Sequence, residues 1–225
     1  MYIILILSIC FILFWLHIII FVQVVRKESK EEEDVPADVH GDGELKSIHL
    51  GNNKYAIVSI YNDEHYFHIR QYEVNRKTGK KYPTKQGISM KPARFASFYA
   101  KLGNIQASVK QMLDSPSAEM AFKLHIGGGV YVSMDHVFNS VSIRHFFVPE
   151  GQTESKATRY GVSLRPNEWD VLYENMEDIR NTTNKLREAE MCIFAPDHCN
   201  QQGMMMCSEC NPFQFAKELA FWRNE

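Results

Sequence analysis

Cysteine is absent from most of this chain. Its five cysteines are Cys10 near the start and Cys192, Cys199, Cys207 and Cys210 near the end, so residues 11–191 contain none. Small secreted domains that cannot build a large core are usually held together by several disulfides. The distribution therefore argues against a disulfide-stapled secreted domain, and it is compatible with a reducing compartment.

The sequence also lacks a recognisable catalytic set. Its nine histidines are scattered, and no Ser-His-Asp or paired-carboxylate spacing occurs. The run Gly127-Gly128-Gly129 lacks the Lys-Ser/Thr pair that follows the glycines of a phosphate-binding loop, so it predicts a turn. We therefore expect a protein that is not an enzyme.

The whole chain has no strong excess of one charge, since its net charge is −2. Its parts, in contrast, differ in charge. Residues 44–113 contain 12 basic and 4 acidic side chains, whereas residues 114–186 contain 7 basic and 10 acidic ones. A cationic segment favours polyanionic partners such as nucleic acid or anionic lipid. The alternative is an ordinary solvated basic surface.

One long apolar run is present, at residues 2–25. It is long enough to cross a hydrocarbon core of about 30 Å as a helix. Because Arg26 and Lys27 follow it, the positive-inside rule would place the rest of the chain in the cytoplasm. The alternative for residues 1–25 is a leader that is not native to the domains. Residues 26–43 are acidic and read as a linker.

The chain contains an internal repeat. Residues 48–51 match residues 124–127, residues 69–72 match 143–146, and residues 87–92 match 161–166. The offset is 76 residues in the first part of the repeat and 74 afterwards. Two copies are too few for a solenoid. The repeat predicts two related domains at residues 44–113 and 114–190, followed by a cysteine-containing segment at residues 191–225.

Each repeat changes its hydrophobic period once. Residues 56–61 and 67–72 have a period of two, in which one set of side chains faces a core and the other faces away, and this predicts strands. Residues 75–80 predict a hairpin turn. Apolar residues then fall at helical spacing after Pro92 and Pro166, which suit a first helical turn. The predicted fold class is α+β, with two tandem ββββα units. Since about 65 residues bury little surface, we expect the units to pair as an intramolecular pseudo-dimer.

One helix covers one face of each predicted sheet, and the other face stays open, where the first unit displays His68, Arg70 and Tyr72. This open face combines cations with aromatic rings. Cations follow the phosphates of a single-stranded nucleic acid, and flat rings stack on its unpaired bases. The alternative is that the rings pack across strands and the lysines are solvated loop residues. The candidate nucleic-acid-binding residues of this face and its hairpins are Tyr61, His68, Arg70, Tyr72, Lys80, Lys81, Lys85, Arg144 and Phe146.

Residues 69–72, the basic hairpin and residues 85–92, with Phe95 three residues later, resemble the C-terminal domain of the positive cofactor 4 family of transcriptional coactivators. Residues 143–144 and 159–166, followed by Trp169, resemble it too. The resemblance implies a curved ββββα domain that dimerises and binds single-stranded or melted DNA. It also implies a cofactor role in RNA polymerase II transcription, with the transcription machinery as a partner.

The resemblance further implies roles for single positions. Tyr61 stands at a base-stacking aromatic, and Arg70 and Arg144 stand at the strand arginine of the family. The second stacking aromatic of the family corresponds to Glu73 in the first unit and to Phe147 in the second. The basic hairpin of the family and the stretch after it correspond to Lys81, Lys85, Lys156 and Arg159.

The C-terminal cysteines form a spacing of their own. Cys207 and Cys210 make a Cys-x2-Cys hook, and Cys192 and Cys199 precede it. Four thiolates at such spacings can hold a structural zinc ion, with His198 as a rival ligand. Free structural thiols are the alternative.

These observations predict a non-enzymatic, single-stranded DNA-binding transcriptional coactivator. It would act in the nucleus if the apolar leader is not retained. The alternative is a membrane-tethered interaction module that has kept the fold and lost nucleic-acid binding.

Overall fold

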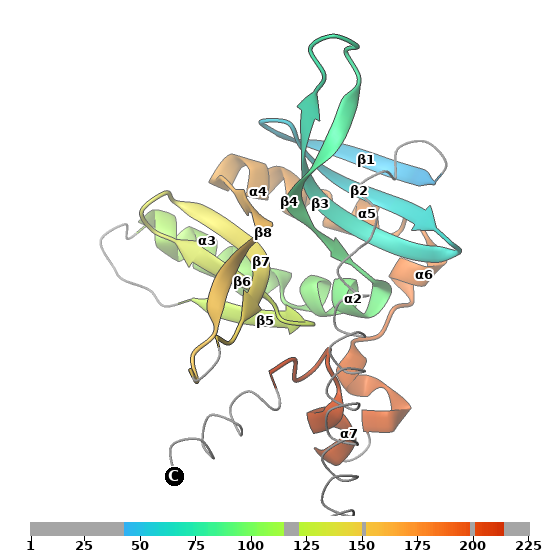
Figure 1. The fold of residues 1–225 in the computed structure, drawn as a ribbon, viewed down its shortest axis with the longest axis vertical. Helices are drawn as coiled ribbons and strands as arrows, with labels where there is room; N and C mark the ends of the chain where they lie inside the picture. Colours follow the sequence, from blue (N-terminus) through green and yellow to red (C-terminus); the bar gives the residue numbers. More distant parts are fainter. Residues whose placement is uncertain (1–42, 115–121, 150–151, 199–200, 214–225) are drawn as a thin grey trace, which may run out of the picture. The chain divides into compact units, whose positions relative to one another are not determined.

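The computed structural model describes residues 43–114, 122–149, 152–198 and 201–213 (Figure 1). The described residues all belong to one compact unit. The predicted membrane segment and residues 26–42 of the predicted acidic linker lie outside the described residues. Within the described part of the chain, no helix combines the length and apolar character needed to cross a membrane.

The first unit is a four-stranded antiparallel sheet followed by helices. Its strands pair in chain order, and the sheet is followed by α2 (Pro92–Ala100) and α3 (Leu102–Asp114). Asn75 and Gly79 close the turn between the third and fourth strands, as predicted. The strands are β1 (Glu44–Gly51), β2 (Lys54–Tyr61), β3 (Glu64–Val74) and β4 (Lys81–Met90).

The second unit repeats this order. Its antiparallel sheet again pairs in sequence and is followed by α4 (Pro166–Glu174), α5 (Met176–Arg180) and α6 (Asn184–Arg187). The predicted α+β class with two ββββα units is therefore confirmed. The strands are β5 (Lys123–Gly127), β6 (Val130–Asp135), β7 (Ser140–Phe147) and β8 (Lys156–Leu164). Two short 3-10 helices, η1 (Cys192–Phe194) and η2 (Pro196–His198), and α7 (Gln201–Met206) come next.

The helical part of each unit is divided, where the sequence predicted one helix. The breaks fall at Lys101 and Asn175, which are equivalent positions 74 residues apart. Both residues have φ near −100° and ψ of 0°, which tightens the last turn before the next helix begins. The apolar periodicity continues across both breaks because both helical segments bury residues in the same core.

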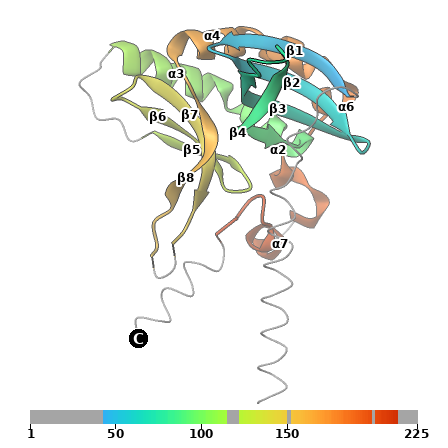
Figure 2. The same cartoon turned by 45° about the horizontal axis from the view of Figure 1, so that its top comes forward.

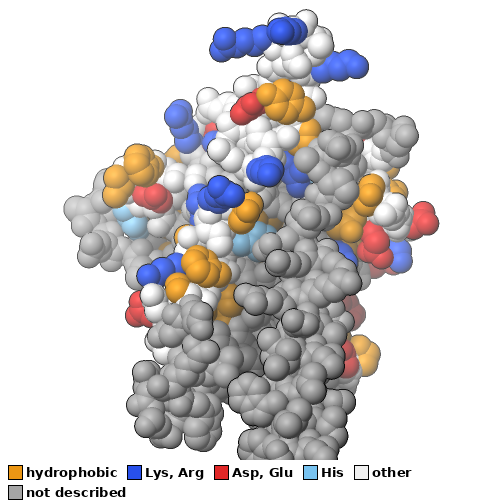
Figure 3. Space-filling view, viewed as in Figure 1, with side chains coloured by type: hydrophobic (Ala, Val, Ile, Leu, Met, Phe, Trp, Pro, Cys, Tyr) orange, Lys and Arg blue, Asp and Glu red, His pale blue; other side chains and the backbone are white. Residues whose placement is uncertain are grey.

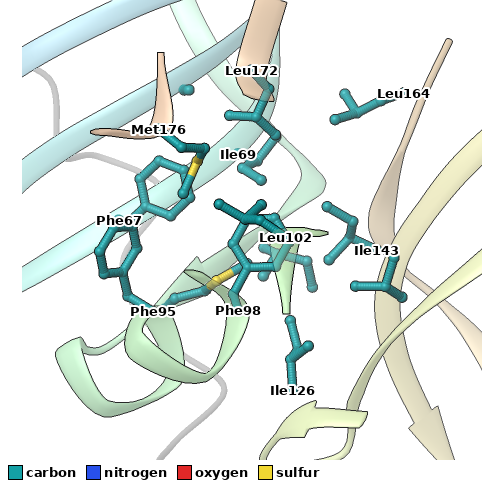
Figure 4. Close-up of a cluster of buried hydrophobic side chains, with 14 of the residues drawn as sticks. Phe67, Ile69, Phe95, Phe98, Leu102, Ile126, Ile143, Leu164, Leu172 and Met176 are labelled. Carbon is teal, nitrogen blue, oxygen red and sulfur yellow. The ribbon is translucent and has the colours of Figure 1, made fainter. Parts of the chain in front are cut away.

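The two units share one hydrophobic core (Figure 4). Phe98 of α2 meets Trp169 of α4 edge to face, with their ring centroids 6.3 Å apart. The indole Nε1 of Trp169 donates a hydrogen bond to Gln106 of α3 over 2.6 Å. The buried residues labelled in Figure 4 are Phe67, Ile69, Phe95, Phe98 and Leu102 from the first unit and Ile126, Ile143, Leu164, Leu172 and Met176 from the second.

Each unit places its first helix against the sheet of the other. Helix α2 contacts β5 as well as β3 and β4, and α4 contacts β1 as well as β7 and β8. Strands β4 and β8 lie next to each other, so the two sheets are neighbours (Figure 2). As a result, both units bury the helix-covered face of each sheet, and the opposite face of each sheet points away from this core.

Candidate nucleic-acid interface

The face of the first sheet that points away from the core carries the predicted arginine. Strand register places Tyr55 opposite Arg70 and Ser89 opposite His68. Because successive side chains of a strand point to opposite faces, Arg70 and His68 share one face, while Ile69 between them is buried in the core.

Arg70 is held in place by the repeated Gly-x-Ser motif of β4. Its Nη2 donates a hydrogen bond to the Ser89 hydroxyl over 2.9 Å. A Cβ atom on Gly87 would lie 2.6 Å from Arg70 Cγ, so the glycine leaves the space in which the side chain lies. Burial lowers the pKa of Arg70, although an arginine remains protonated at neutral pH. The motif therefore fixes a half-buried cation on this face.

The second unit builds the same arrangement around Arg144. Its Nη2 donates to Ser163 over 2.9 Å, its Nε to Ser142 over 2.6 Å, and its Nη1 to the Thr158 carbonyl over 3.2 Å. A Cβ atom on Gly161 would lie 2.1 Å from Arg144 Cβ. The glycine and serine that define the sequence repeat thus serve the same purpose twice. Arg144 has more hydrogen bonds within the protein than Arg70 has.

His68 is not displayed to solvent, and the prediction that it is exposed was wrong. Only 6% of the residue is exposed, because its ring lies between the hydroxyls of Ser59 and Ser89, 2.9 and 2.7 Å away. Burial and the neighbouring Arg70 lower its pKa to about 3, so the ring is neutral at pH 7. The role that this geometry gives it is to orient Ser89, which in turn holds Arg70.

Tyr55 lies directly opposite Arg70 on the neighbouring strand β2. Lys81 donates a hydrogen bond to the Tyr55 hydroxyl and lies 4.6 Å from its ring centroid. Tyr72 packs edge-on against Tyr55 at 5.2 Å and is only 6% exposed, so the prediction that it is displayed was wrong as well. Tyr72 therefore supports Tyr55 and is not itself a surface for a base.

The β3–β4 hairpin carries the exposed cations. Lys80, Lys81 and Lys85 are all exposed, as predicted, and Figure 3 shows Lys and Arg side chains gathered on this projecting hairpin. Glu73, the acidic residue at the position of the second stacking aromatic, accepts a hydrogen bond from Tyr82 over 2.7 Å. That hydrogen bond raises the pKa of Tyr82. Tyr82 is 44% exposed, so a ring is available beside the lysines.

Tyr61 lies at the other end of the same sheet. It is the last residue of β2, pairs with Glu64 and is 36% exposed. Six residues separate it from Tyr55, which corresponds to about 20 Å of strand. Tyr61, Arg70 and the lysine hairpin are therefore spread along the length of the face.

The equivalent face of the second unit is arranged differently. Tyr131, the counterpart of Tyr55, lies against Phe146 at 5.0 Å, and the ammonium of Lys123 sits 4.7 Å from the first ring and 4.1 Å from the second. Phe213 from the C-terminal segment stacks parallel to Tyr131, with the centroids 6.3 Å apart. This face is thus partly covered by the chain itself.

The remaining candidates of the second unit are exposed. Phe147 is 47% exposed at the end of β7 and pairs with Lys156. Arg159 is exposed and lies over the ring of Tyr160, 5.4 Å from its centroid. These four side chains place cations beside rings at the open end of β7 and β8.

The C-terminal segment brings together a group that can bind a metal. The ligand atoms of Cys192, His198, Cys207 and Cys210 all lie within 4.8 Å of one another. Cys199, the fourth predicted ligand, lies outside the described residues. The predicted hook is therefore joined by Cys192 and by the rival ligand His198.

Sequence reasoning did not single out Tyr55, Tyr131 or Phe213 as site residues. Tyr55 and Tyr131 match each other in the repeat and sit on the arginine-bearing face by period two, so that signal was available. No such signal existed for Phe213, because its contact with Tyr131 joins residues 82 positions apart in the chain.

Comparison with known proteins places the similarity in the first unit. Residues 48–100 match the family described as Transcriptional Coactivator p15 (PC4). A Caenorhabditis elegans protein named "Putative RNA polymerase II transcriptional coactivator" is 32% identical over 69 residues, which are 31% of this chain and 56% of that protein. The chain thus spans about half the length of this curated relative. No solved structure gives a significant match.

The matched residues run from β1 into α2 and include Tyr61, Arg70, Lys81 and Lys85. A second copy of the family domain at residues 114–190 stays a prediction. Residues 48–100 of this chain are therefore similar to the PC4 coactivator domain.

Proposed function

We propose that this chain is a non-enzymatic protein that binds single-stranded or melted DNA and acts as a coactivator of RNA polymerase II transcription in the nucleus. The similarity of residues 48–100 to the PC4 domain supports this proposal, as does the name of the C. elegans relative. The transcription machinery would be its second partner.

The observation that carries the proposal is the fixed position of Arg70. Ser89 and Gly87 hold its guanidinium on the face that the helices leave uncovered, next to the ring of Tyr55. A guanidinium held in this way can pair with a phosphate without first losing much side-chain freedom. The neighbouring ring offers a stacking surface for an unpaired base.

The candidate residues of this face suggest a path for the strand. In this proposal the DNA runs along the sheet from Tyr61, past Arg70, to Lys81 and Lys85 on the hairpin. Bases stack on the rings, and the lysines follow the phosphates. Duplex DNA hides its bases inside the helix, so it would lose the stacking contacts and bind more weakly.

We also propose that the two units act as an internal counterpart of the family dimer. Their shared core and the reciprocal contacts of α2 and α4 support this proposal. The chain would then bind DNA as a monomer, without pairing with a second copy.

The test is oligonucleotide binding by the full chain, measured by fluorescence anisotropy at low salt. Arg70→Ala should weaken binding of a single-stranded oligonucleotide about tenfold, because a charge-assisted contact to phosphate is lost. Lys85→Ala should weaken it less. The control is Lys110→Ala, which removes the same charge from an exposed position on α3 and should leave the affinity unchanged.

Increasing salt should weaken binding, with a slope of log K against log salt near −0.7 for each phosphate contacted. Absence of binding at low salt would overturn the proposal and favour a tethered interaction module. Equal losses for Arg70→Ala and Lys110→Ala would show that binding depends on net charge and not on the proposed face.

A further inference from the structure

The group formed by Cys192, His198, Cys207 and Cys210 has the chemistry of a structural zinc site. All three thiols are free, and the sulfurs of Cys192 and Cys207 are 3.6 Å apart. Tetrahedral zinc with Zn–S bonds of about 2.3 Å would hold its sulfurs about 3.8 Å apart. This pair therefore stands close to the spacing that the ion requires, and all four ligand atoms lie within 4.8 Å of one another.

The histidine is oriented as a ligand. Nδ1 of His198 is hydrogen-bonded to the carbonyl of Cys192, which leaves Nε2 for another partner. Nε2 is buried and finds no hydrogen-bond partner among the described residues. A metal-bound histidine commonly donates its other ring N–H to a backbone carbonyl, and this bond selects the nitrogen that binds the ion.

The Cys-x2-Cys hook carries Glu209 between its two cysteines. The Glu209 carboxylate accepts two hydrogen bonds from Arg94 at the start of α2, over 2.7 and 2.6 Å. Its backbone carbonyl accepts a third from the amide of Gly128 in the β5–β6 turn, over 2.8 Å. An ion bound to Cys207 and Cys210 would hold both ends of the hook. Glu209 would then be held in place between Arg94 and the β5–β6 turn.

The equivalent contact, between α4 and the β1–β2 turn, does not use an extra segment. Position 94 of the first unit corresponds to Glu168 in the second, and Glu168 itself reaches the β1–β2 turn, where it bonds to Asn52 and Lys54 over 2.7 and 2.8 Å. The basic Arg94 instead has Glu209 as its acidic partner at the β5–β6 turn. Glu209 of the hook thus supplies the carboxylate that position 94 of the first unit lacks.

The segment continues onto the face of the second unit. Pro212 and Phe213 lie above Gly129, each 3.7 Å from the position of a Cβ atom there, and Phe213 stacks on Tyr131 with an interplanar angle of 2°. Tyr131 is the counterpart of Tyr55. Residues 207–213 therefore cover in the second unit the surface that is proposed to contact bases in the first.

We propose that Cys192, His198, Cys207 and Cys210 bind one structural Zn²⁺, and that this ion fastens residues 207–213 over the face of the second unit. The consequence for DNA rests on the proposed function. With Tyr131 covered, the first unit supplies the binding face of the chain.

The first measurement is the zinc content of the full chain, purified with reduced thiols. We expect about one zinc ion per chain, a loss of zinc in Cys207→Ser, and no loss in the matched variant Ser208→Ala. Zinc far below one per chain, or a disulfide between Cys192 and Cys207 in the purified protein, would overturn the site.

The second measurement is hydrogen–deuterium exchange of the unmutated full chain before and after a chelator removes zinc. Residues 127–131 should exchange about tenfold faster without the ion, because the Gly128 amide loses a partner, and they should recover when zinc is restored. The matched turn at residues 51–55 should not change. Equal exchange of residues 127–131 in both states would overturn the fastening role. This test contains no DNA, so failure of DNA binding would leave its outcome intact.

Discussion

Replacing Glu168 with glutamine tests how the two units are joined. The Glu168 carboxylate is fully buried and accepts hydrogen bonds from Asn52, Lys54 and the Arg165 backbone amide, over 2.7, 2.8 and 2.8 Å. Glutamine keeps the size of the side chain but removes the charge and one acceptor. Lys54, which is only 13% exposed at its side chain, would then be left without its acidic partner.

The expected cost follows from this burial. Removing one partner of a buried pair costs about 3–5 kcal/mol, and the partial exposure of Lys54 reduces the penalty. We expect Glu168→Gln to lower the free energy of unfolding by about 2–4 kcal/mol at pH 7. Urea denaturation followed by circular dichroism measures this value. Asp170→Asn is the matched control, because it removes an exposed carboxylate from the same helix and should change the value by less than about 0.5 kcal/mol.

The pH dependence provides a second readout of the same contact. Burial alone would raise the pKa of Glu168, but the hydrogen bonds from Lys54, Asn52 and Arg165 outweigh it and lower the pKa. The stability that the ionised carboxylate contributes is therefore fully present above its ordinary pKa of about 4.3 and is lost as the pH falls through the lower folded value. The glutamine variant should lack this component.

The expected stabilisation would be refuted if the free energy of unfolding of Glu168→Gln lay within about 0.5 kcal/mol of that of the unmutated protein. A double-mutant cycle with Lys54→Met would refute it as well if the two effects were simply additive, since residues in direct contact should couple. Either result would mean that the bond seen between α4 and the β1–β2 turn does not hold the units together.

Three further predictions concern the binding face and the core. Gly87→Ala should displace Arg70 and weaken binding of single-stranded DNA in the anisotropy assay. The control Gly103→Ala has open space around the new methyl group, so it should leave the affinity unchanged. It should also raise the free energy of unfolding by up to about 1 kcal/mol. His68 has a folded pKa of about 3, below its ordinary 6.5, so unfolding free energy should fall as the pH drops from about 6.5 towards 3, and His68→Gln should reduce that slope in a pH series of denaturation curves. Phe98→Ala should cost about 3–5 kcal/mol and lower the stability of both units in one transition, because its ring lies in the shared core; two separate transitions in calorimetry would contradict this.

The sequence was sufficient to predict the strands and the helical segments. It was insufficient to predict which side chains lie above each face of the sheets. Period-two alternation identified the strand around Arg70, because successive side chains of a strand occupy opposite faces of a sheet, and the repeat extended this prediction to Arg144. Alternation cannot reveal what lies above a face, so the burial of His68 by serines from two neighbouring strands was not predicted. The break at Lys101 was missed because apolar spacing continues through it.

The candidate sites show the same division. The Cys-x2-Cys spacing predicted a metal site, and the described residues hold a group at this hook that could bind a metal ion. Spacing alone could not show that the fold brings His198 to the three thiols. The contacts of Glu168 and Glu209 with the other unit join residues more than 100 positions apart, and no local pattern records them.

The opposite charges at equivalent positions of α2 and α4 decide which halves can associate. Two copies of the first half would bring Arg94 towards the turn that carries Lys54, so two cations would meet. Two copies of the second would bring Glu168 to a turn where Val130 replaces the lysine, and its carboxylate would be buried without a counter-ion. The charges of each half therefore complement those of the other half, and two identical halves would fit each other poorly. The two halves of this one polypeptide are thus matched to each other as the two different subunits of a heterodimer are.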